Sequence, residues 1–444
     1  MLGISIMADR FARLDRRELM AGLGSAVLAP ALPRIAAAEA GAALALQAKA
    51  GLIALRPGEP DTAIWSLQGG ADRDFRYRRG DQLEITLRNE LPGPTVLNWY
   101  GIGVPAAEPL AARAPLASAA GESAVIPLRQ AGTFMCDLRL LGDAQPRPSA
   151  ARAMVVTESE AVAVDRDEVL LIEDWRLRSD GSAIAPGMDP GDAKPVYTVN
   201  GVISPDIRLR THERVRFRFI NGCQRAVVGI KIAAHEVRVM ALDSQPAEPF
   251  LARAGAIVLA PGGRADVFID AAVPPGSPSA ILLHDGTEAH PIGRLVASSE
   301  PPLRNSPLPI PAPLPSNGLP SQFDLKNALR FDLTLGGSPT DWARPASFAL
   351  SAAPAFRAKV GRAVVLALTN RANIAAVFHL HGHHFRLLDR LDDGWKPFWL
   401  DTLALAAGQT QRIAFAAEHA GRWLLESMAS DWAAPRLVRW YSVE

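Results

Sequence analysis

The chain is poor in cysteine, with only Cys136 and Cys223 among its 444 residues. Two cysteines exclude a disulfide framework. They leave two interpretations: one bridge in an oxidising compartment, or two small buried side chains. Excess charge is also lacking, since the net charge is +1, and nothing indicates a nucleic-acid partner. No stretch beyond the N-terminus is long and apolar enough to be an integral membrane segment.

Glycine and proline are plentiful by contrast, at 35 and 36 residues, which suits many short strands separated by turns. Residues 83–88 alternate apolar and polar side chains, as a half-buried strand should. A turn, a similar strand and then an asparagine recur at residues 80–89, 213–221 and 359–370. Three copies at domain spacing predict an all-β protein of three similar β-sandwich domains.

The predicted domains cover residues 41–160, 161–300 and 321–444. Residues 301–320 are dense in proline and are interpreted as an extended linker between the second and third domains. Residues 1–40 contain Arg16 and Arg17 before a mildly apolar run, followed by Ala-x-Ala sequences. This pattern is typical of a twin-arginine signal peptide cleaved near residues 38–40, and predicts export to a bacterial periplasm. The alternative is a cytosolic protein with a basic, frayed N-terminus.

Four of the nine histidines lie within residues 379–384. If this run is a strand, alternate side chains share a face, so His379, His381 and His383 would point the same way. A His-x-His pair on one face can begin a metal site. The alternative is a hydrogen-bonded polar patch. Other chemistry has little support, because the sequence contains no Gly-x-Ser-x-Gly or His-Glu-x-x-His motif.

Several stretches resemble the multicopper oxidase family. The most specific is residues 378–383, Phe-His-Leu-His-Gly-His; residues 87–92, 98–101, 216–221, 259–264 and 421–423 also resemble family landmarks. The resemblance implies three cupredoxin-like, Greek-key sandwiches. It also implies twelve copper-binding side chains: a type 1 site with a cysteine thiolate, and a trinuclear site of eight histidines in His-x-His pairs.

Most of those twelve positions carry other residues in this chain. The resemblance places two trinuclear ligands at His379 and His381. The ten remaining positions fall on Asn98, Tyr100, Asp137, Arg139, Ala376, Glu426, Ser427, Met428, Trp432 and Leu437. The departure implies degenerate copper sites without laccase-like activity. We expect Tyr100, Asp137, Arg139, Glu426 and the two histidines to fill the copper cavity with paired charges.

These traits resemble the copper-free, exported cell-division proteins of the same superfamily. The resemblance implies a non-catalytic periplasmic scaffold with protein partners and neither a cofactor nor catalytic residues. The alternative is an oxidoreductase or copper-binding protein with a residual mononuclear site. His379 and His381, with His383 or a carboxylate of Glu426 or Asp137, would then hold one copper or zinc ion.

Overall fold

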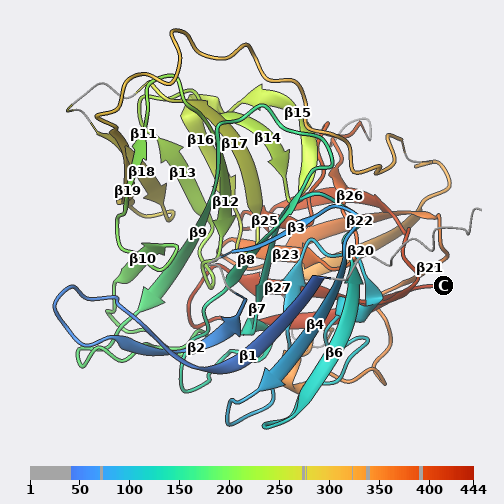
Figure 1. Cartoon of the computed structure of the whole chain (residues 1–444). Helices are drawn as coiled ribbons and strands as arrows, with labels where there is room; N and C mark the ends of the chain where they lie inside the picture. Colours follow the sequence, from blue (N-terminus) through green and yellow to red (C-terminus); the bar gives the residue numbers. More distant parts are fainter. Residues whose placement is uncertain are drawn as a thin grey trace, which may run out of the picture. The chain divides into compact units, whose positions relative to one another are not determined.

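A computed structural model describes residues 42–70, 74–272, 276, 278–322, 324–336, 341–389 and 394–444. The predicted signal peptide lies outside these residues. Regular structure in the described chain is β-strand (Figure 1), apart from short 3-10 helices: η2 (Pro105–Ala107), η3 (Arg139–Leu141), η4 (Arg253–Gly255) and η5 (Pro345–Ser347). The all-β prediction is therefore confirmed. None of the helices in the described residues has the length and apolar character needed to cross a bilayer.

The first sandwich consists of two four-stranded sheets, with strand orders β2-β1-β4-β6 and β3-β8-β7-β5. Its strands are β1 (Ala42–Ile53), β2 (Thr62–Gly69), β3 (Phe75–Arg78), β4 (Gln82–Asn89), β5 (Asn98–Tyr100), β6 (Gly121–Pro127), β7 (Gly132–Asp137) and β8 (Arg152–Thr157). Burial alternates residue by residue along β4, as its sequence predicts. Leucines and isoleucines of the buried face meet Phe134 and Met154 from the other sheet in one core.

The middle sandwich has a six-stranded sheet, β10-β9-β12-β17-β14-β15, and a five-stranded sheet, β11-β19-β18-β13-β16. Its strands are β9 (Arg166–Arg176), β10 (Pro195–Val199), β11 (Asp206–Leu209), β12 (Arg214–Asn221), β13 (Val228–Ile232), β14 (Arg238–Leu242), β15 (Gln245–Leu251), β16 (Ala256–Leu259), β17 (Arg264–Asp270), β18 (Ser279–His284) and β19 (Ala289–Ala297). Both sheets contribute to one apolar core.

The third sandwich has sheets in the orders β20-β22-β26-β24 and β21-β28-β27-β23-β25. Its strands are β20 (Leu329–Leu335), β21 (Arg357–Ala358), β22 (Ala363–Asn370), β23 (Ala376–Leu380), β24 (Arg386–Leu387), β25 (Thr402–Leu405), β26 (Thr410–Ala416), β27 (Gly421–Ala429) and β28 (Leu437–Val443). Phe378, Trp423 and Tyr441 are fully buried in the core between these sheets.

The repeated asparagine has the same role in all three sandwiches. Asn89, Asn221 and Asn370 end strands β4, β12 and β22. Each side-chain carbonyl accepts the backbone N–H two residues later, and each amide donates to two or more carbonyls of neighbouring loops. Burying these loops is possible because the asparagine satisfies their backbone groups. The recurring motif in the sequence therefore marks a recurring loop anchor.

Both cysteines are free and buried, so the interpretation as two small buried side chains is correct and the bridge is not formed. Cys136 belongs to the core of the first sandwich and Cys223 to that of the middle sandwich. Burial raises the pKa of both thiols.

The proline-rich segment between β19 and β20 contains no strand among its described residues. The segment lies against the middle sandwich, where its Leu314 packs on Met240 and Phe268. Figure 1 shows it as the ochre coil along the top of the view. We call residues 301–317 the strap.

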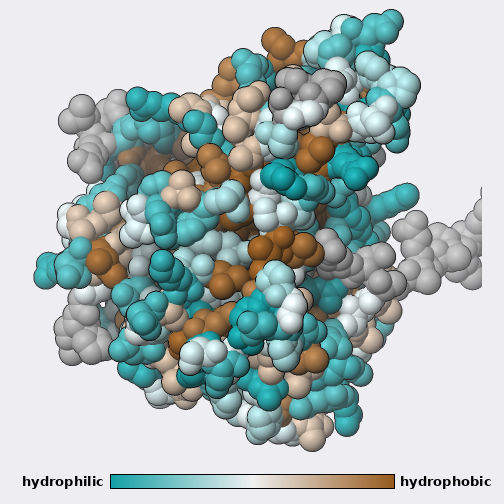
Figure 2. All heavy atoms as spheres, turned by 90° about the vertical axis from the view of Figure 1, so that its left-hand side faces the viewer, coloured by the Kyte–Doolittle hydropathy of each residue, from teal (hydrophilic) through white to brown (hydrophobic). Residues whose placement is uncertain are grey.

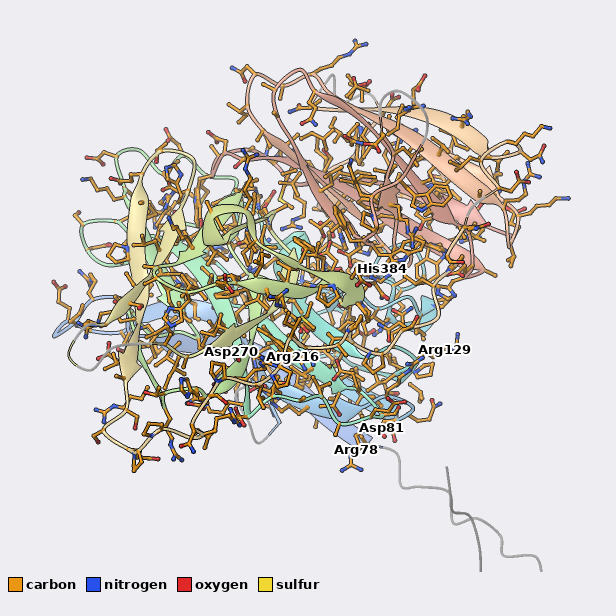
Figure 3. All side chains as sticks on the ribbon, turned by 90° about the horizontal axis from the view of Figure 1, so that it is seen from above. Arg78, Asp81, Arg129, Arg216, Asp270 and His384 are labelled. Atoms are coloured by element: carbon orange, nitrogen blue, oxygen red, sulfur yellow. The ribbon has the colours of Figure 1, made fainter. Side chains whose placement is uncertain are left out.

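The turn between β14 and β15 connects all three sandwiches. The Asp243 carboxylate accepts the backbone N–H groups of Arg264, Asp401 and Thr402, at 2.9, 3.0 and 3.1 Å. The neighbouring Ser244 hydroxyl donates to the carbonyl of Thr133 in the first sandwich, at 2.5 Å. His384 of the third sandwich (Figure 3) lies 2.9 Å from the carbonyl of Asp243 through Nε2. We call this turn the three-way joint.

Candidate functional site

Two cross-strand pairs from different sandwiches meet at the candidate site. Asn98 on β5 pairs with Asp137 on β7, and His379 on β23 pairs with Glu426 on β27. The Asn98 amide donates to Oε1 of Glu426 across the boundary, at 3.2 Å. All four side chains are at most 2% exposed. The fold therefore brings into contact Asn98 and Glu426, which lie 328 positions apart in the chain.

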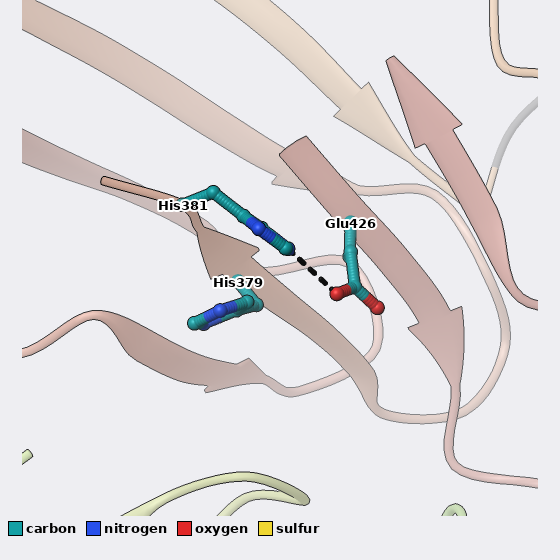
Figure 4. A group of neighbouring side chains, drawn as sticks. All are labelled: His379, His381 and Glu426. Atoms are coloured by element: carbon teal, nitrogen blue, oxygen red, sulfur yellow. Dashed lines mark hydrogen bonds and ion pairs between the residues drawn. The ribbon is translucent and has the colours of Figure 1, made fainter. Parts of the chain in front are cut away.

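His381 lies between two carboxylates just beyond the end of β23. Its Nε2 lies 2.7 Å from Oε1 of Glu426 (Figure 4), and its Nδ1 lies 3.2 Å from Oε2 of Glu108. Burial alone would lower the pKa of His381, but the two carboxylates outweigh burial and raise it to about 10. His381 is therefore an imidazolium at neutral pH, and both of its nitrogens donate.

His379 has the opposite protonation state, although it is only two residues away. Its Nδ1 lies 3.1 Å from the carbonyl of Asp401 and 3.0 Å from the hydroxyl of Thr402. Its Nε2 is buried without a hydrogen-bond partner. Burial and the charge on His381 lower the pKa of His379 to about 3, so its ring is neutral. The ring lies 4.7 Å from the Tyr100 ring, centroid to centroid.

Arg436 supplies the second cation of the site. Its guanidinium bonds Oε2 of Glu426 and lies 3.3 Å from the hydroxyl of Tyr100. Burial would raise the pKa of Glu426, but Arg436 and His381 overcome that effect and hold the pKa well below its usual range. Burial raises the pKa of Tyr100, which keeps its hydroxyl neutral. We call Glu108, His381, Glu426 and Arg436 the ion cluster.

Arg139 is buried and pairs with Asp137, as the sequence analysis expected, but its other partners lie away from Glu426. Its guanidinium binds Glu173 at 2.5 Å and the carbonyls of Ser149 and Gly222, and its Nε is 4.0 Å from Asp137. Arg139 begins η3, separated by one residue from the end of β7, and its side chain is directed to Glu173 on β9 of the middle sandwich. The predicted charge cluster is therefore corrected: Arg436, rather than Arg139, is the cation that contacts Glu426.

His383 also departs from the prediction. Strand β23 ends at Leu380, and Gly382 has a φ of 77°, so the alternation stops before His383. Its Nδ1 lies 2.7 Å from the hydroxyl of Tyr441, and its ring packs against Phe415 and Trp423 in the third core. The prediction that His383 shares a face with His379 and His381 was wrong, because a turn replaces the strand.

The positions that the resemblance assigns to type 1 copper are mostly apolar. Ala376 is fully buried in the third core, and Leu437 packs against that core. Ser427 pairs with Leu437 across β27 and β28. Trp432 donates its indole N–H to the carbonyl of Ala185, at 3.1 Å. Met428, assigned instead to the trinuclear site, packs with Ala260 and Val377.

Sequence reasoning missed Glu108 and Arg436. Glu108 follows η2. Its Oε1, the oxygen that does not contact His381, accepts the backbone N–H of Leu424 at 2.8 Å. Arg436 lies between Trp432 and Leu437, two positions that the resemblance assigns to copper ligands. Its backbone N–H donates to Asp143 at 2.6 Å. Neither residue belongs to a periodic pattern. The only available signal was electrostatic, since a glutamate buried beside two histidines requires a nearby cation.

One group of side chains in the described chain has the spacing of a metal site. His379, His381 and Glu426 each offer a ligand atom, and these atoms lie within 4.8 Å of one another. Asn98 Oδ1 and Asp137 Oδ2 are also buried without hydrogen-bond partners. A groove of 790 Å³ lies elsewhere, lined by parts of β1, β2, β8 and β9, and it includes Glu173 but neither histidine.

Comparisons with known proteins agree with the fold. Two family models, both described as multicopper oxidase, match residues 166–277 and 322–444. Multicopper oxidase MmcO of Mycobacterium tuberculosis is 22% identical over 415 residues, covering 79% of this chain and 77% of that protein. A multicopper oxidase structure from Pseudomonas thermotolerans has 25% identity and a TM-score of 0.77, covering 90% of this chain and 99% of its own. Lac15 from a marine microbial metagenome has 24% identity and a TM-score of 0.74, with 91% and 100% covered.

Proposed function

The chain belongs to the multicopper oxidase family, and we propose that it is a copper-free member, exported to the periplasm by the twin-arginine route as a non-catalytic scaffold. Support for cell division is the role that the sequence resemblance favours. The single observation that carries the proposal is the ion cluster. Two protein cations, Arg436 and the His381 imidazolium, contact Glu426, a position that the sequence resemblance assigns to copper binding.

The donor set fits a trinuclear copper site poorly. Such a site needs many neutral imidazoles, and His379 is the single imidazole here with a free, unprotonated nitrogen. His381 would have to lose a proton and break a bond to a carboxylate before it could bind a metal. The guanidinium of Arg436 adds a fixed positive charge, which repels a metal cation. These residues therefore support no electron-transfer or oxygen-reducing step.

The type 1 position lacks suitable donors as well. It has Ser427 where the family has its cysteine, and Ala376, Trp432 and Leu437 at the remaining ligand positions. A hydroxyl is a hard ligand and does not replace a thiolate in binding and tuning copper. Without this site a laccase-type enzyme has no entry point for electrons.

Exposed apolar side chains favour a protein partner. Figure 2 shows hydrophobic patches among hydrophilic residues on one face of the molecule. Exposed large hydrophobic residues include Leu52 and Val202; Leu52 lines the 790 Å³ groove, and Val202 follows Gly201, which also lines it. Exposed apolar surface of this kind often marks an interaction site.

The alternative function is a mononuclear copper or zinc site at His379, His381 and Glu426. The observation that favours it is the unpartnered Nε2 of His379, together with ligand atoms within 4.8 Å. A metal there would polarise a bound ligand or water. It would need a proton released from His381.

The deciding experiment is metal analysis of protein purified from the periplasm without chelator, by plasma mass spectrometry. We expect less than about a tenth of an equivalent of copper or zinc. The matched variant is His379→Ala with His381→Ala, and the control is His284→Ala, at an exposed histidine of the middle sandwich. One equivalent of copper or zinc that is lost only in the double variant would reject the metal-free scaffold and establish the alternative.

A further inference from the structure

The strap has a sequence that dictates its own conformation. Proline occupies every second position at residues 307, 309, 311, 313 and 315. Every residue from 306 to 315 is therefore either a proline or the residue before one. Proline fixes its own φ near −65°, and the residue preceding it is driven to extended backbone. These preferences favour a polyproline II helix along the strap, with about three residues per turn.

Burial along the strap follows that period of three. Leu308 and Pro311 are half-buried, and Leu314 is 6% exposed. The residues one position earlier, Pro307, Ile310 and Pro313, are all exposed, and Ile310 is 79% exposed. One ridge of the helix faces the middle sandwich, and a second apolar ridge faces solvent. We call Pro307, Ile310 and Pro313 the outer ridge.

The strap is held by hydrogen bonds to its carbonyl oxygens. Arg210 donates to the carbonyl of Pro301, and Arg214 donates to that of Leu308, both at 3.0 Å. At the far end Arg79 donates to the carbonyl of Ser316 at 2.9 Å. Prolines have no N–H to give, so surrounding side chains provide the donors. These contacts fix both ends and leave the outer ridge uncovered.

A helix that is already extended and fixed is suited to recognition. Binding a flexible peptide costs ordering entropy, and a preformed polyproline II helix avoids most of that cost. Proteins that bind such helices use grooves lined by aromatic side chains, which pack against an apolar ridge of the helix. We propose that the outer ridge is a docking site for a partner protein with an aromatic-lined, polyproline-binding groove.

This docking site gives the proposed scaffold a class of partner, and in that sense it rests on the proposed function. Its physical basis is nevertheless separate, because the strap lies outside the ion cluster. Metal content and docking can therefore fail independently. Copper-loaded protein that still docks through the strap would reject the copper-free proposal and leave the docking site standing.

The test is photo-cross-linking of the full chain exported in its own host, with benzoylphenylalanine at position 310. The matched control carries the same group at position 258, where Val258 is 70% exposed on β16. We expect position 310 to give a discrete cross-linked product that position 258 does not. The linked peptide of the partner should contain tryptophan or tyrosine. No product above the control, or a product with a second copy of this chain, would overturn the proposal.

Competition gives a second, independent readout. A synthetic peptide of residues 305–316 should abolish the cross-link when present in excess, because it forms the same helix. The same peptide with its prolines replaced by alanine should have no effect, since it keeps Ile310 but loses the conformation. Equal competition by both peptides would show recognition of Ile310 alone and would overturn the polyproline basis. Ile310→Asp, at an exposed site, should weaken binding of the captured partner at least about tenfold without changing Tm.

Discussion

The two regions that the family resemblance assigns to copper differ in what occupies them. Around Glu426, carboxylates are buried with Arg436 and a protonated His381. Around Ala376 and Ser427, the side chains are small or apolar and join the third core. Strand β27 contributes to both, because consecutive residues point to opposite faces. Buried carboxylates require cations of matching geometry, whereas an apolar region needs only filled volume. The first region should therefore be sensitive to charge and pH, and the second to volume alone.

Arg436→Met should have the largest effect. It removes the guanidinium that neutralises Glu426 and leaves a carboxylate buried with one cation fewer. Breaking a buried ion pair in this way typically destabilises a protein by about 3–5 kcal/mol. Unfolding by urea measures this loss. The control is Arg78→Met at an exposed arginine, where a change within about 0.5 kcal/mol is expected. An equal loss of unfolding free energy in the two variants would show that the charge of Arg436 does not stabilise the ion cluster.

Phe378→Ala should cost about 3 kcal/mol, through lost burial and the cavity that remains. Phe378 is fully buried in the third core. The loss should be the same at pH 6 and pH 9, because Phe378 packs among apolar side chains of the third core. A loss that varied strongly with pH would erase the distinction between the two regions.

His381→Gln should cost about 1–3 kcal/mol near neutral pH, by removing charged hydrogen bonds. The folded pKa of about 10 lies above the unfolded value of about 6.5. The stabilisation from protonated His381 is therefore complete below about pH 6.5. It declines as pH rises and is lost through about pH 10. Wild type and variant should converge in stability as pH approaches 10.

Nitrogen chemical shifts of the imidazoles provide a direct check at pH 7. His381 should show two protonated nitrogens, and His379 should show one. Two neutral rings would contradict the ion cluster and would make the mononuclear metal site more attractive.

Ser427→Cys should have the smallest effect, below about 1.5 kcal/mol, because the two side chains are similar in volume. It restores the thiolate position but not the other ligands. Adding copper to the variant should therefore give no intense blue absorption. A blue product would show that the apolar region still has the geometry of a copper site.

Much of the fold could be predicted from the sequence because its signals are local. Alternation in residues 83–88 indicated β4, and the repeated turn, strand and asparagine indicated three related units. Each asparagine accepts the backbone N–H two residues later, so that part of its role is visible in a short window, whereas its amide also donates to a carbonyl 27 to 38 positions away. Both predictions depend on neighbours along the chain rather than on distant contacts.

The site was harder to predict because its contacts are distant. His379 and His381 stood out as a pair, and Glu426 was placed by comparison with the family. Glu108 and Arg436 reach the same place from loops with no periodic pattern. His383 was misplaced because alternation was extended through Gly382, whose positive φ turns the chain. Glycine within an expected strand was the available warning.

The three-way joint affects how cooperatively the protein unfolds. Asp243 is a shared acceptor for its own sandwich and for the third, while Ser244 bonds the first. Losing any one sandwich would leave the buried polar groups of the others without partners. An unfolding intermediate in which only one sandwich has unfolded is therefore high in free energy. Residues 42–444 should accordingly lose structure in one cooperative heat-absorption peak rather than three.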